Sequence, residues 1–492
     1  MKTTKKIFAA VLAVMMIALM IPFSASAAAE SYSATYKLAV DATDTDKVGN
    51  YTFSFFKIAD LNLTTGEYSC TITDKALEDA VKGTYSDAKS QQIITACDNL
   101  YKTDKAAFGT AATTISFSST VTEATATVTD PGLYYVYCTS KPAKVTGVQS
   151  SLASLPYFDG KNYVSVDQTE YNLAEKVSTS SVSVDKTADK TYVGDNNKTV
   201  TYTLTASTAG SIDNQLKKYA IVDTMDEGLT FNENSVVVKY DGAVDALALG
   251  TDYSIEKNYT YTGKNGKATA TFAVVFESAT LESKDFYDAK TVVVTYTADL
   301  NEKAKLNTPI TNTDGLVYGN DSDTNFEPGK NSPDVFTYGM KVVKVNGNDT
   351  TQKLADAEFQ IFTDAEAKTP LTVDGKKVVA KTDATGEAKF VLEGTTTAFK
   401  FDAKQTYYAK EIAAPTGYNL NSSVFTVSID KSKEYTFVGN IADGDNVAVA
   451  NYPVTVPKTG GMGTMMFYVG GAALIACAGV LLFVLKRKKA AK

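Results

Sequence analysis

Short runs in which β-branched or aromatic residues alternate with other residues recur through much of this chain. Examples are TVTYTLT at 199–205 and TVVVTYT at 291–297. Alternation places every second side chain on the same face of a strand, so each run predicts a half-buried β-strand. Helical periodicity is rare, and its best example lies at 74–100. We therefore expect a mainly β protein with antiparallel strands, because helices are too few for parallel crossovers.

The N-terminus has the features of a secretory signal. Lys2, Lys5 and Lys6 precede an apolar stretch at 7–23, and Ala-Ser-Ala follows at 25–27. A basic start, an apolar centre and a small-x-small end are typical of a signal peptide that is removed on export. Residues 1–27 are therefore predicted to be a signal peptide, and the mature chain to lie outside the cell.

The C-terminus has a second processing signal. The sequence VPKTG at 456–460 is followed by an apolar run at 464–485 and a basic tail at 486–492. About 22 apolar residues can span a membrane as a helix, and basic residues keep the tail cytoplasmic. The layout resembles the LPXTG cell-wall sorting signals of Gram-positive surface proteins, with Val456 in place of Leu. The resemblance implies that a sortase cuts between Thr459 and Gly460.

The region between these signals holds about 430 residues, which is enough for two to four domains. We expect three, at 30–177, 178–333 and 334–453, with a linker or exposed loop at 319–333. Short strands separated by Gly, Asn and Asp turns suggest tandem Ig-like β-sandwiches, with a minor helix in the first.

Composition argues against several functions. The net charge of −8 disfavours a nucleic-acid partner, and the chain has no His. Without His the common nucleophile pairs and metal sites cannot be built, so a turnover enzyme, a metal and a cofactor are not expected. Cys477 lies in the apolar run, whereas Cys70, Cys97 and Cys138 permit one disulfide whose pairing the sequence does not fix.

The third domain carries the motifs KVVKVN at 341–346, LADAEFQIF at 354–362, YYAKEIAAPTGY at 407–418 and VAVAN at 447–451. Together they resemble a Cna-B-type domain, a family that forms a spontaneous Lys–Asn isopeptide bond beside a buried acid. The resemblance assigns Lys344 as the amine, Asn451 as the amide and Glu411 as the acid, with Lys341 as a weaker alternative amine. Burial lowers the pKa of a Lys and raises that of a Glu, which this chemistry requires.

The second domain resembles the Cna-A-like middle domain of pilus backbone proteins. The resemblance rests on DKT at 185–187, YVGD at 192–195, IVDTMDEGLTF at 221–231 and NT at 312–313. It assigns Lys186 as the amine, Asp223 as the acid and Asn312 as the amide. Lys190 and Asn320 are the alternative amine and amide.

A lysine between the first two domains is the candidate for joining subunits. Backbone pilins have a lysine about ten residues before the reactive lysine of the second domain, and Lys176 precedes Lys186 by that spacing. The Tyr-Pro pair of the family motif is replaced by Ala174-Glu175. Lys161 and Lys144 are poorer candidates.

The combined resemblance implies the backbone subunit of a sortase-assembled pilus on a Gram-positive cell surface. A pilus-type sortase would join the Thr459 carbonyl to the Lys176 amine of the next copy, head to tail. Expected partners are that sortase, other copies of this chain, tip or minor pilins and peptidoglycan; the sequence names no host ligand. The alternative is a monomeric adhesin anchored to peptidoglycan by the same signal.

Overall fold

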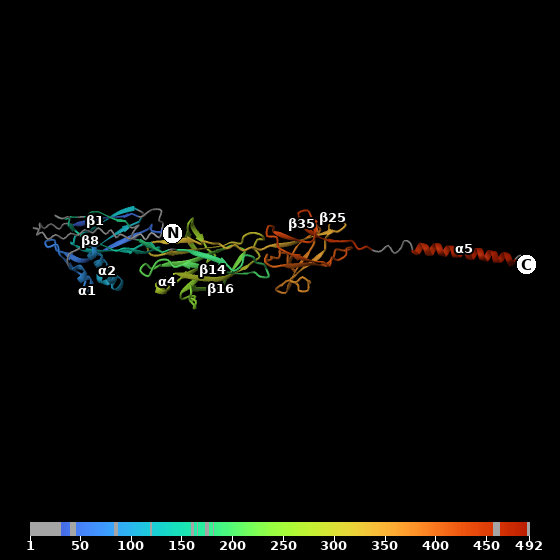
Figure 1. Ribbon diagram of the computed structural model, residues 1–492, viewed down its shortest axis with the longest axis horizontal. Coiled ribbons are helices and arrows are strands. Elements are labelled where there is room, and N and C mark those ends of the chain that lie inside the picture. The colour runs from blue at the N-terminus through green and yellow to red at the C-terminus, as the bar shows by residue number, and fades with distance from the viewer. Residues whose placement is uncertain are drawn as a thin grey trace, which may run out of the picture. The chain divides into compact units, whose positions relative to one another are not determined.

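The computed structural model describes residues 31–39, 46–82, 87–118, 121–158, 162–164, 166–172, 177–180, 182–455 and 463–489. The described residues form two compact units. The N-terminal unit extends to Phe336 without 194–197, and the C-terminal unit holds 194–197 and the residues from Thr337 onward. Apart from 194–197, the ranges expected for the first and second domains lie in the N-terminal unit. The range expected for the third lies in the C-terminal unit from Thr337 onward, and three domains remain the expected division. The expected mainly β fold is confirmed (Figure 1).

Among the described residues, the first domain contains a five-stranded antiparallel sheet, a three-stranded sheet, two two-stranded sheets and three helices. Its strands are β1 (Tyr32–Ala39), β2 (Tyr51–Leu61), β3 (Tyr68–Cys70), β4 (Thr113–Phe117), β5 (Val121–Val128), β6 (Gly132–Ser140), β7 (Val145–Val148), β8 (Ser151–Leu155), β9 (Tyr157–Phe158), β10 (Tyr163–Val164), β11 (Val166–Asn172) and β12 (Val177–Thr179). Its helices are α1 (Lys75–Val81), α2 (Asp87–Thr103) and the 3-10 helix η1 (Lys105–Phe108).

Strand β2 lies inside the first domain and is buried on both faces. Phe53 and Phe55 pack into one core with β1 and β5, whereas Phe56 and Ile58 pack against α1, α2 and η1. The sheet order is β3-β2-β6-β8, with β4 also paired to β2. The predicted helical segment at 74–100 thus becomes the two helices that cover this sheet (Figure 1).

The second domain is a sandwich of a four-stranded and a five-stranded sheet, ordered β13-β14-β21-β16 and β17-β20-β15-β22-β23. The strands are β13 (Val184–Ala188), β14 (Thr199–Ser207), β15 (Lys218–Met225), β16 (Leu229–Tyr240), β17 (Tyr253–Lys257), β18 (Thr260–Gly263), β19 (Gly266–Thr269), β20 (Phe272–Phe276), β21 (Thr291–Leu300), β22 (Asn312–Gly319) and β23 (Thr324–Pro328). Two short helices, α3 (Ser278–Leu281) and α4 (Lys284–Ala289), precede β21.

The two alternating runs that predicted strands become β14 and β21, which pair antiparallel with Tyr202 opposite Tyr296. Both tyrosines are buried and their rings stack. The threonines that alternate with the buried residues along each strand face outward. The expectation of a linker or exposed loop at 319–333 was wrong for its centre. Strand β23 pairs with β22 there, and its Phe326 contacts Tyr261.

The third domain also consists of two sheets, ordered β25-β24-β35-β34 and β27-β28-β26-β31-β32. Its strands are β24 (Gly339–Asn346), β25 (Asp349–Lys353), β26 (Glu358–Phe362), β27 (Thr372–Val373), β28 (Lys376–Lys381), β29 (Glu387–Lys389), β30 (Val391–Leu392), β31 (Tyr407–Ala413), β32 (Val424–Val427), β33 (Tyr435–Val438), β34 (Ile441–Asp443) and β35 (Asn446–Asn451). Pairing is antiparallel except that β24 runs parallel to β33 and β35, as β1 does to β11.

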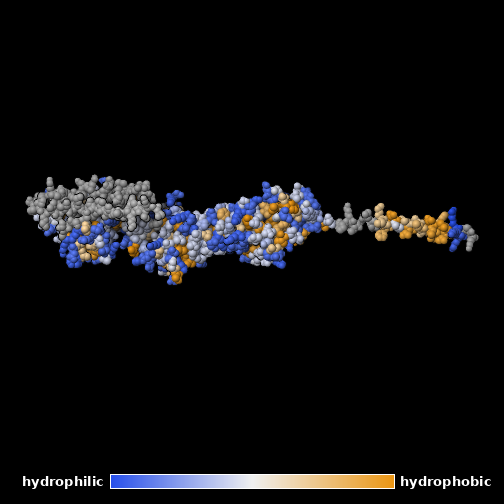
Figure 2. All heavy atoms as spheres, in the orientation of Figure 1, coloured by the Kyte–Doolittle hydropathy of each residue, from blue (hydrophilic) through white to orange (hydrophobic). Residues whose placement is uncertain are grey.

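A single long helix, α5 (Gly463–Lys489), ends the described chain. Residues Met465–Lys489 are long and apolar enough to cross a membrane, with a mean hydropathy of 2.3. Figure 2 shows the apolar side chains along this helix and the hydrophilic residues at its end, which include Lys486 and Lys489. This matches the expected apolar run and basic tail.

Candidate functional site

The third domain buries a lysine, a glutamate and an asparagine together. Lys344 lies on β24 and Asn451 on the neighbouring parallel strand β35, where Asn451 is opposite Asn346. Residues two apart on a strand share a face, so Lys344 and Asn451 point to the same side of the sheet. Glu411 reaches them from β31 of the facing sheet. All three side chains are buried.

The three groups contact one another directly. The Lys344 ammonium Nζ lies 2.5 Å from Asn451 Oδ1 and 3.4 Å from Glu411 Oε1. Asn451 Nδ2 donates to Glu411 Oε1 at 2.9 Å, and the backbone N–H of Asn421 donates to Glu411 Oε2 at 2.7 Å. A neutral acid at this position is expected to donate to the Asn451 carbonyl oxygen and polarise it. The structure differs, because Glu411 accepts from the amide nitrogen and Lys344 Nζ contacts the carbonyl oxygen.

Burial changes the charge state of this lysine. Desolvation lowers the pKa of Lys344 from 10.5 to about 8, although the nearby Glu411 carboxylate opposes the shift. The Phe359 ring, 5.7 Å from Nζ, lines the same site. At pH 7 about a tenth of the amine is therefore uncharged, far more than for an exposed Lys, and an uncharged amine is a nucleophile.

The second domain builds a similar cluster across its two sheets. Lys186 comes from β13 of one sheet, whereas Asp223 on β15 and Asn312 on β22 come from the other. Strands β15 and β22 pair so that Met225 lies opposite Asn312 and Asp223 lies opposite Asp314. The side chains of Lys186, Asp223 and Asn312 are buried.

In this cluster a tyrosine connects the acid to the amide. Lys186 Nζ lies 2.7 Å from Asp223 Oδ2 and 2.9 Å from Asn312 Oδ1. The Tyr296 hydroxyl donates to Asp223 Oδ2 at 2.6 Å and accepts from Asn312 Nδ2 at 2.7 Å. Burial raises the pKa of Asp223, and the Lys186 charge opposes this. The raised pKa favours a neutral carboxyl that can donate a proton.

Both clusters hold an amine against an amide inside a water-excluded core, with a carboxyl beside them. This arrangement suits attack of the amine on the amide carbon with loss of ammonia.

The alternative residues lie elsewhere. Asn320 donates to the Lys141 carbonyl and the Asn214 side chain, and Lys190 lies 3.9 Å from Asp189. Lys341 Nζ lies 3.6 Å from Glu387 and over the Tyr435 ring.

Sequence reasoning missed three contributors to these sites. Asp314 follows Asn312 by two residues, so strand alternation alone could have placed it on the same face. Tyr296 lies in the alternating run at 291–297, which gave no reason to prefer it over other buried aromatics. The backbone N–H of Asn421 has no sequence signal, because every residue except Pro carries that group.

Several predicted site residues lie outside the described residues. These are the signal peptide at 1–27, the subunit-joining candidates Lys176 and Lys161, and the cleavage pair Thr459 and Gly460. Lys144 is described and is mostly buried. Its Nζ lies 2.7 Å from Asp46 and 3.8 Å from Glu327, which makes it a poor external nucleophile.

Cys70, Cys97 and Cys138 are all free in this structure. Cys138 lies in the core beside β1, whereas Cys97 lies in the core beneath the helices, so the sheet separates them. Cys70 borders the helical core, but its thiol donates to the Ile72 carbonyl.

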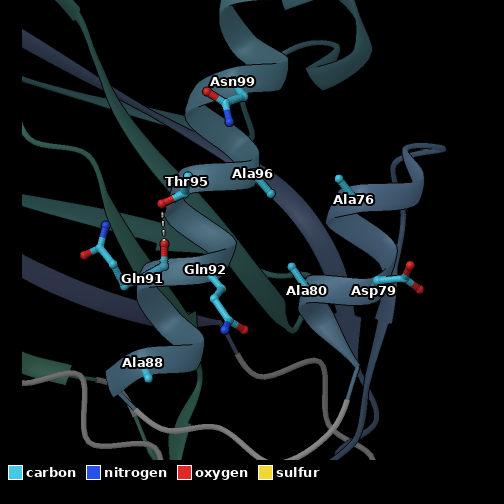
Figure 3. A pocket seen from close by; sticks show the side chains of 9 residues that line it. All are labelled: Ala76, Asp79, Ala80, Ala88, Gln91, Gln92, Thr95, Ala96 and Asn99. Atoms are coloured by element: carbon cyan, nitrogen blue, oxygen red, sulfur yellow. Dashed lines mark hydrogen bonds between the residues drawn. The ribbon is translucent and has the colours of Figure 1, made fainter.

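An open groove of about 730 Å³ lies between α1 and α2. Figure 3 shows that small alanines and the polar side chains of Asp79, Gln91, Gln92, Thr95 and Asn99 line it. Asp79 forms an ion pair with Lys75 at 2.6 Å. With a single carboxylate and no nucleophile besides Thr95, whose hydroxyl donates to the Gln91 carbonyl, the lining gives no basis for catalysis.

Comparison with known proteins finds a family match in the third domain and a relative that aligns with most of the chain. Residues 339–441 match the SpaA family, described as a prealbumin-like fold domain. The fimbrial subunit type 1 of Actinomyces viscosus is 26% identical over 414 residues, which cover 74% of each chain.

A solved pilus protein has a similar fold, and a second solved pilin also matches. The full-length RrgB pilus protein of Streptococcus pneumoniae matches with a TM-score of 0.50 at 16% identity, covering 87% of this chain and 99% of that one. The T6 backbone pilin of Streptococcus pyogenes matches at 20% identity with a TM-score of 0.45, covering 81% and 80%. The chain is thus similar to a fimbrial subunit over about three quarters of its length and has the fold of a solved pilus protein.

Proposed function

We propose that this chain is a pilus backbone subunit whose copies are joined covalently and whose second and third domains each close an internal Lys–Asn isopeptide bond. The observation that carries the proposal is the contact of the buried Lys344 amine with the Asn451 amide beside Glu411. A buried ion pair alone adds little stability, so a reactive cluster is the better explanation for burying these groups twice in one chain.

In the third domain, Lys344 Nζ attacks Asn451 Cγ, and the C–Nδ2 bond then breaks. Glu411 contacts Nδ2, so its carboxyl can supply the proton with which this nitrogen leaves as ammonia. The proton lost by Nζ restores the carboxyl, and the products are one amide and one ammonia. The same bond changes in the second domain join Lys186 to Asn312.

Between subunits, the proposal assigns the bond to Thr459 and Lys176. A sortase breaks the Thr459–Gly460 bond and holds the Thr459 carbonyl as a thioester, and the Lys176 amine of another copy displaces the enzyme. The apolar helix α5 with its basic end supports this order of events, because it can hold the exported chain in the membrane until cleavage.

Intact mass tests the internal bonds. Each bond should lower the mass by about 17 Da, the mass of the ammonia released. Asn451→Ala and Asn312→Ala should each lack one of these two mass losses, and the double variant should have its full calculated mass. The exposed Asn348→Ala is the matched control and should keep both losses. A wild-type ectodomain at its full calculated mass would rule out both bonds.

Coexpression with its sortase tests the subunit bond. Wild type should form a ladder of covalent oligomers, Lys176→Ala should abolish the ladder, and the control Lys161→Ala should retain it. A ladder that persists in Lys176→Ala would assign the amine to another lysine. If wild type is attached to peptidoglycan but never forms a ladder, the chain is the monomeric anchored adhesin instead.

A further inference from the structure

A second carboxyl lies at the second-domain site. Asp314 is two residues beyond Asn312 on β22 and lies opposite Asp223 on β15. Its side chain has no exposed surface, and its Oδ1 lies 4.0 Å from Lys186 Nζ. Neither of its carboxyl oxygens has a hydrogen-bond partner among the residues that the structure describes.

Burying such a carboxyl without a hydrogen-bond partner is unfavourable, so this group needs an explanation. Asp223, by contrast, accepts a hydrogen bond from Tyr296 and contacts Lys186. Gly329 packs directly on Asp314, where an added Cβ would lie 2.5 Å from the carboxyl atoms. A glycine at this position therefore leaves space for the carboxyl next to the Lys186 amine.

We propose that Asp314 is a second catalytic carboxyl of the second domain and accepts the proton that Lys186 Nζ loses as it attacks Asn312. The inference rests on the proposed isopeptide chemistry. Two acids then share the two proton transfers. Asp314 takes the proton from Lys186 Nζ, and Asp223 supplies the proton to Asn312 Nδ2 through the Tyr296 hydroxyl.

Neutral Lys186, the Asn312 amide, protonated Asp223 and ionised Asp314 react. The Nζ–Cγ bond forms, the Cγ–Nδ2 bond breaks, and the Nζ proton goes to Asp314. Asp223 gives its proton to Tyr296 as Tyr296 gives one to Nδ2, so ammonia leaves. The products are the isopeptide bond, ionised Asp223 and protonated Asp314.

The electrostatics of the site agree with this division. Burial raises the pKa of Asp314 to about 6; the Lys186 charge opposes the shift, whereas Asp223 and Asp185 add to it. A proton acceptor works best when its pKa is near the working pH, and Asp314 is ionised above that value. The rate of bond formation in the second domain should therefore fall as the pH drops below about 6.

The third domain provides an internal reference. Among the described residues, Glu411 is the one carboxyl within ion-pair distance of Lys344. A change at Asp314 should therefore leave the Lys344–Asn451 bond unaffected, and both bonds can be followed in one sample of the full-length chain.

The test follows bond formation during cell-free synthesis of the full-length chain in detergent. Samples are quenched in acid and denaturant at intervals from pH 5 to 8, digested, and assayed by mass spectrometry for both cross-linked peptides. Asp314→Ala removes the acceptor, and Asp314→Glu should partly restore it. Gly329→Ala displaces the carboxyl, with Gly147→Ala as its control because nothing lies within 4 Å of a Cβ there.

In wild type we expect the Lys186–Asn312 peptide to form more slowly below about pH 6. In Asp314→Ala its rate should fall about 100-fold and lose the additional decrease that begins near pH 6, while the Lys344–Asn451 peptide forms at the normal rate. An unchanged rate in Asp314→Ala would overturn the role of Asp314 alone. Absence of the Lys186–Asn312 peptide in wild type would overturn the proposed second-domain bond itself. If Asp314→Ala does not fold, a wild-type rate without a change near pH 6 overturns the inference.

Discussion

Lys344 illustrates how burial prepares a residue for chemistry. In water its amine would be almost fully charged at neutral pH, and a charged amine cannot attack a carbonyl. The side chain has no exposed surface and shares its site with one carboxyl and one amide. The folded domain therefore holds the reactive form that the unfolded chain does not populate.

If the Lys344–Asn451 bond cannot form, the free energy of unfolding of the third domain should depend on pH. In Asn451→Ala the amine stays free, with its pKa lowered from 10.5 to about 8 in the folded domain. Between these values the unfolded chain binds the proton more tightly, so the free energy of unfolding should rise with pH, by up to about 3 kcal/mol. Urea unfolding of the third domain at pH values from 7 to 10.5 measures this rise in the free energy of unfolding. The control Lys344→Met/Asn451→Ala should lack the rise, and a flat profile in Asn451→Ala would contradict the prediction.

Burial should protect two of the cysteines from alkylation. Burial raises the pKa of Cys138 to about 12 and that of Cys97 further, so neither forms a thiolate at neutral pH. Maleimide should label both only after denaturation, whereas the half-buried Cys70 should react slowly in the folded chain. Mass mapping of labelled peptides identifies each site. Rapid labelling of Cys97 in the folded chain would show that the helical core opens readily.

Among the elements, the β22–β23 hairpin depends on one missing side chain. At Gly315 an added Cβ would lie 2.3 Å from the Phe326 ring, which packs against β22 from the next strand. The glycine thus permits an aromatic cover over the edge of the sheet that also carries Asn312 and Asp314.

Gly315→Ala should therefore destabilise the second domain by about 1–3 kcal/mol, the usual cost of overpacking. Urea unfolding of the chain checks this. Gly263→Ala is the matched control, because the nearest atom to its Cβ would be 3.5 Å away, an ordinary contact. Equal stability of the two variants would mean that Phe326 moves aside at little cost.

Sequence patterns predicted the strands and helices better than they predicted the contacts between side chains. Strands β14 and β21 followed from alternation, since threonine outward and tyrosine inward is what a half-buried strand requires. Strand β23 was missed because TNFEP contains one apolar side chain and ends in Pro, which is typical of an exposed loop or edge strand. The pairing of β23 depends on the shape of β22 rather than on the amino-acid sequence of β23 itself.

The site was predictable in part. Family resemblance named Lys186, Asp223 and Asn312, which do lie together, although no pattern of spacing could bring residues from two sheets into contact. Asp314 and Tyr296 were missed because their roles depend on register across β15, β21 and β22. Long-range register of this kind is a property of the folded sandwich.

At the scale of the whole N-terminal unit, polar groups fasten the first domain to the second. Asn320 Nδ2 donates to the Lys141 carbonyl, and Asn214 Nδ2 donates to the carbonyls of Pro142 and Val145. The Asp323 carboxylate accepts from the backbone N–H of Ala143 at 3.0 and 3.1 Å. These bonds fix the chain where it leaves β6.

Asp323→Ala should loosen this junction, because it leaves the buried Ala143 N–H without its acceptor. Hydrogen exchange at residues 141–148 should accelerate at least about tenfold, while exchange in β14 and β21 stays unchanged. The exposed Asp245→Ala is the matched control. Equal protection in both variants would show that the junction holds without the Asp323 contact.

The parallel pairing of β24 with β35 has a mechanical consequence. These are the first and last strands of the third domain, so tension applied through its two ends would slide them past each other and load all their hydrogen bonds at once. A bond between Lys344 and Asn451 would remove even this sliding. The intervening chain, with a separation of 107 residues, would extend to roughly 360 Å if unravelled. With the bond closed that length is never released, and the domain transmits load as a rod of fixed length.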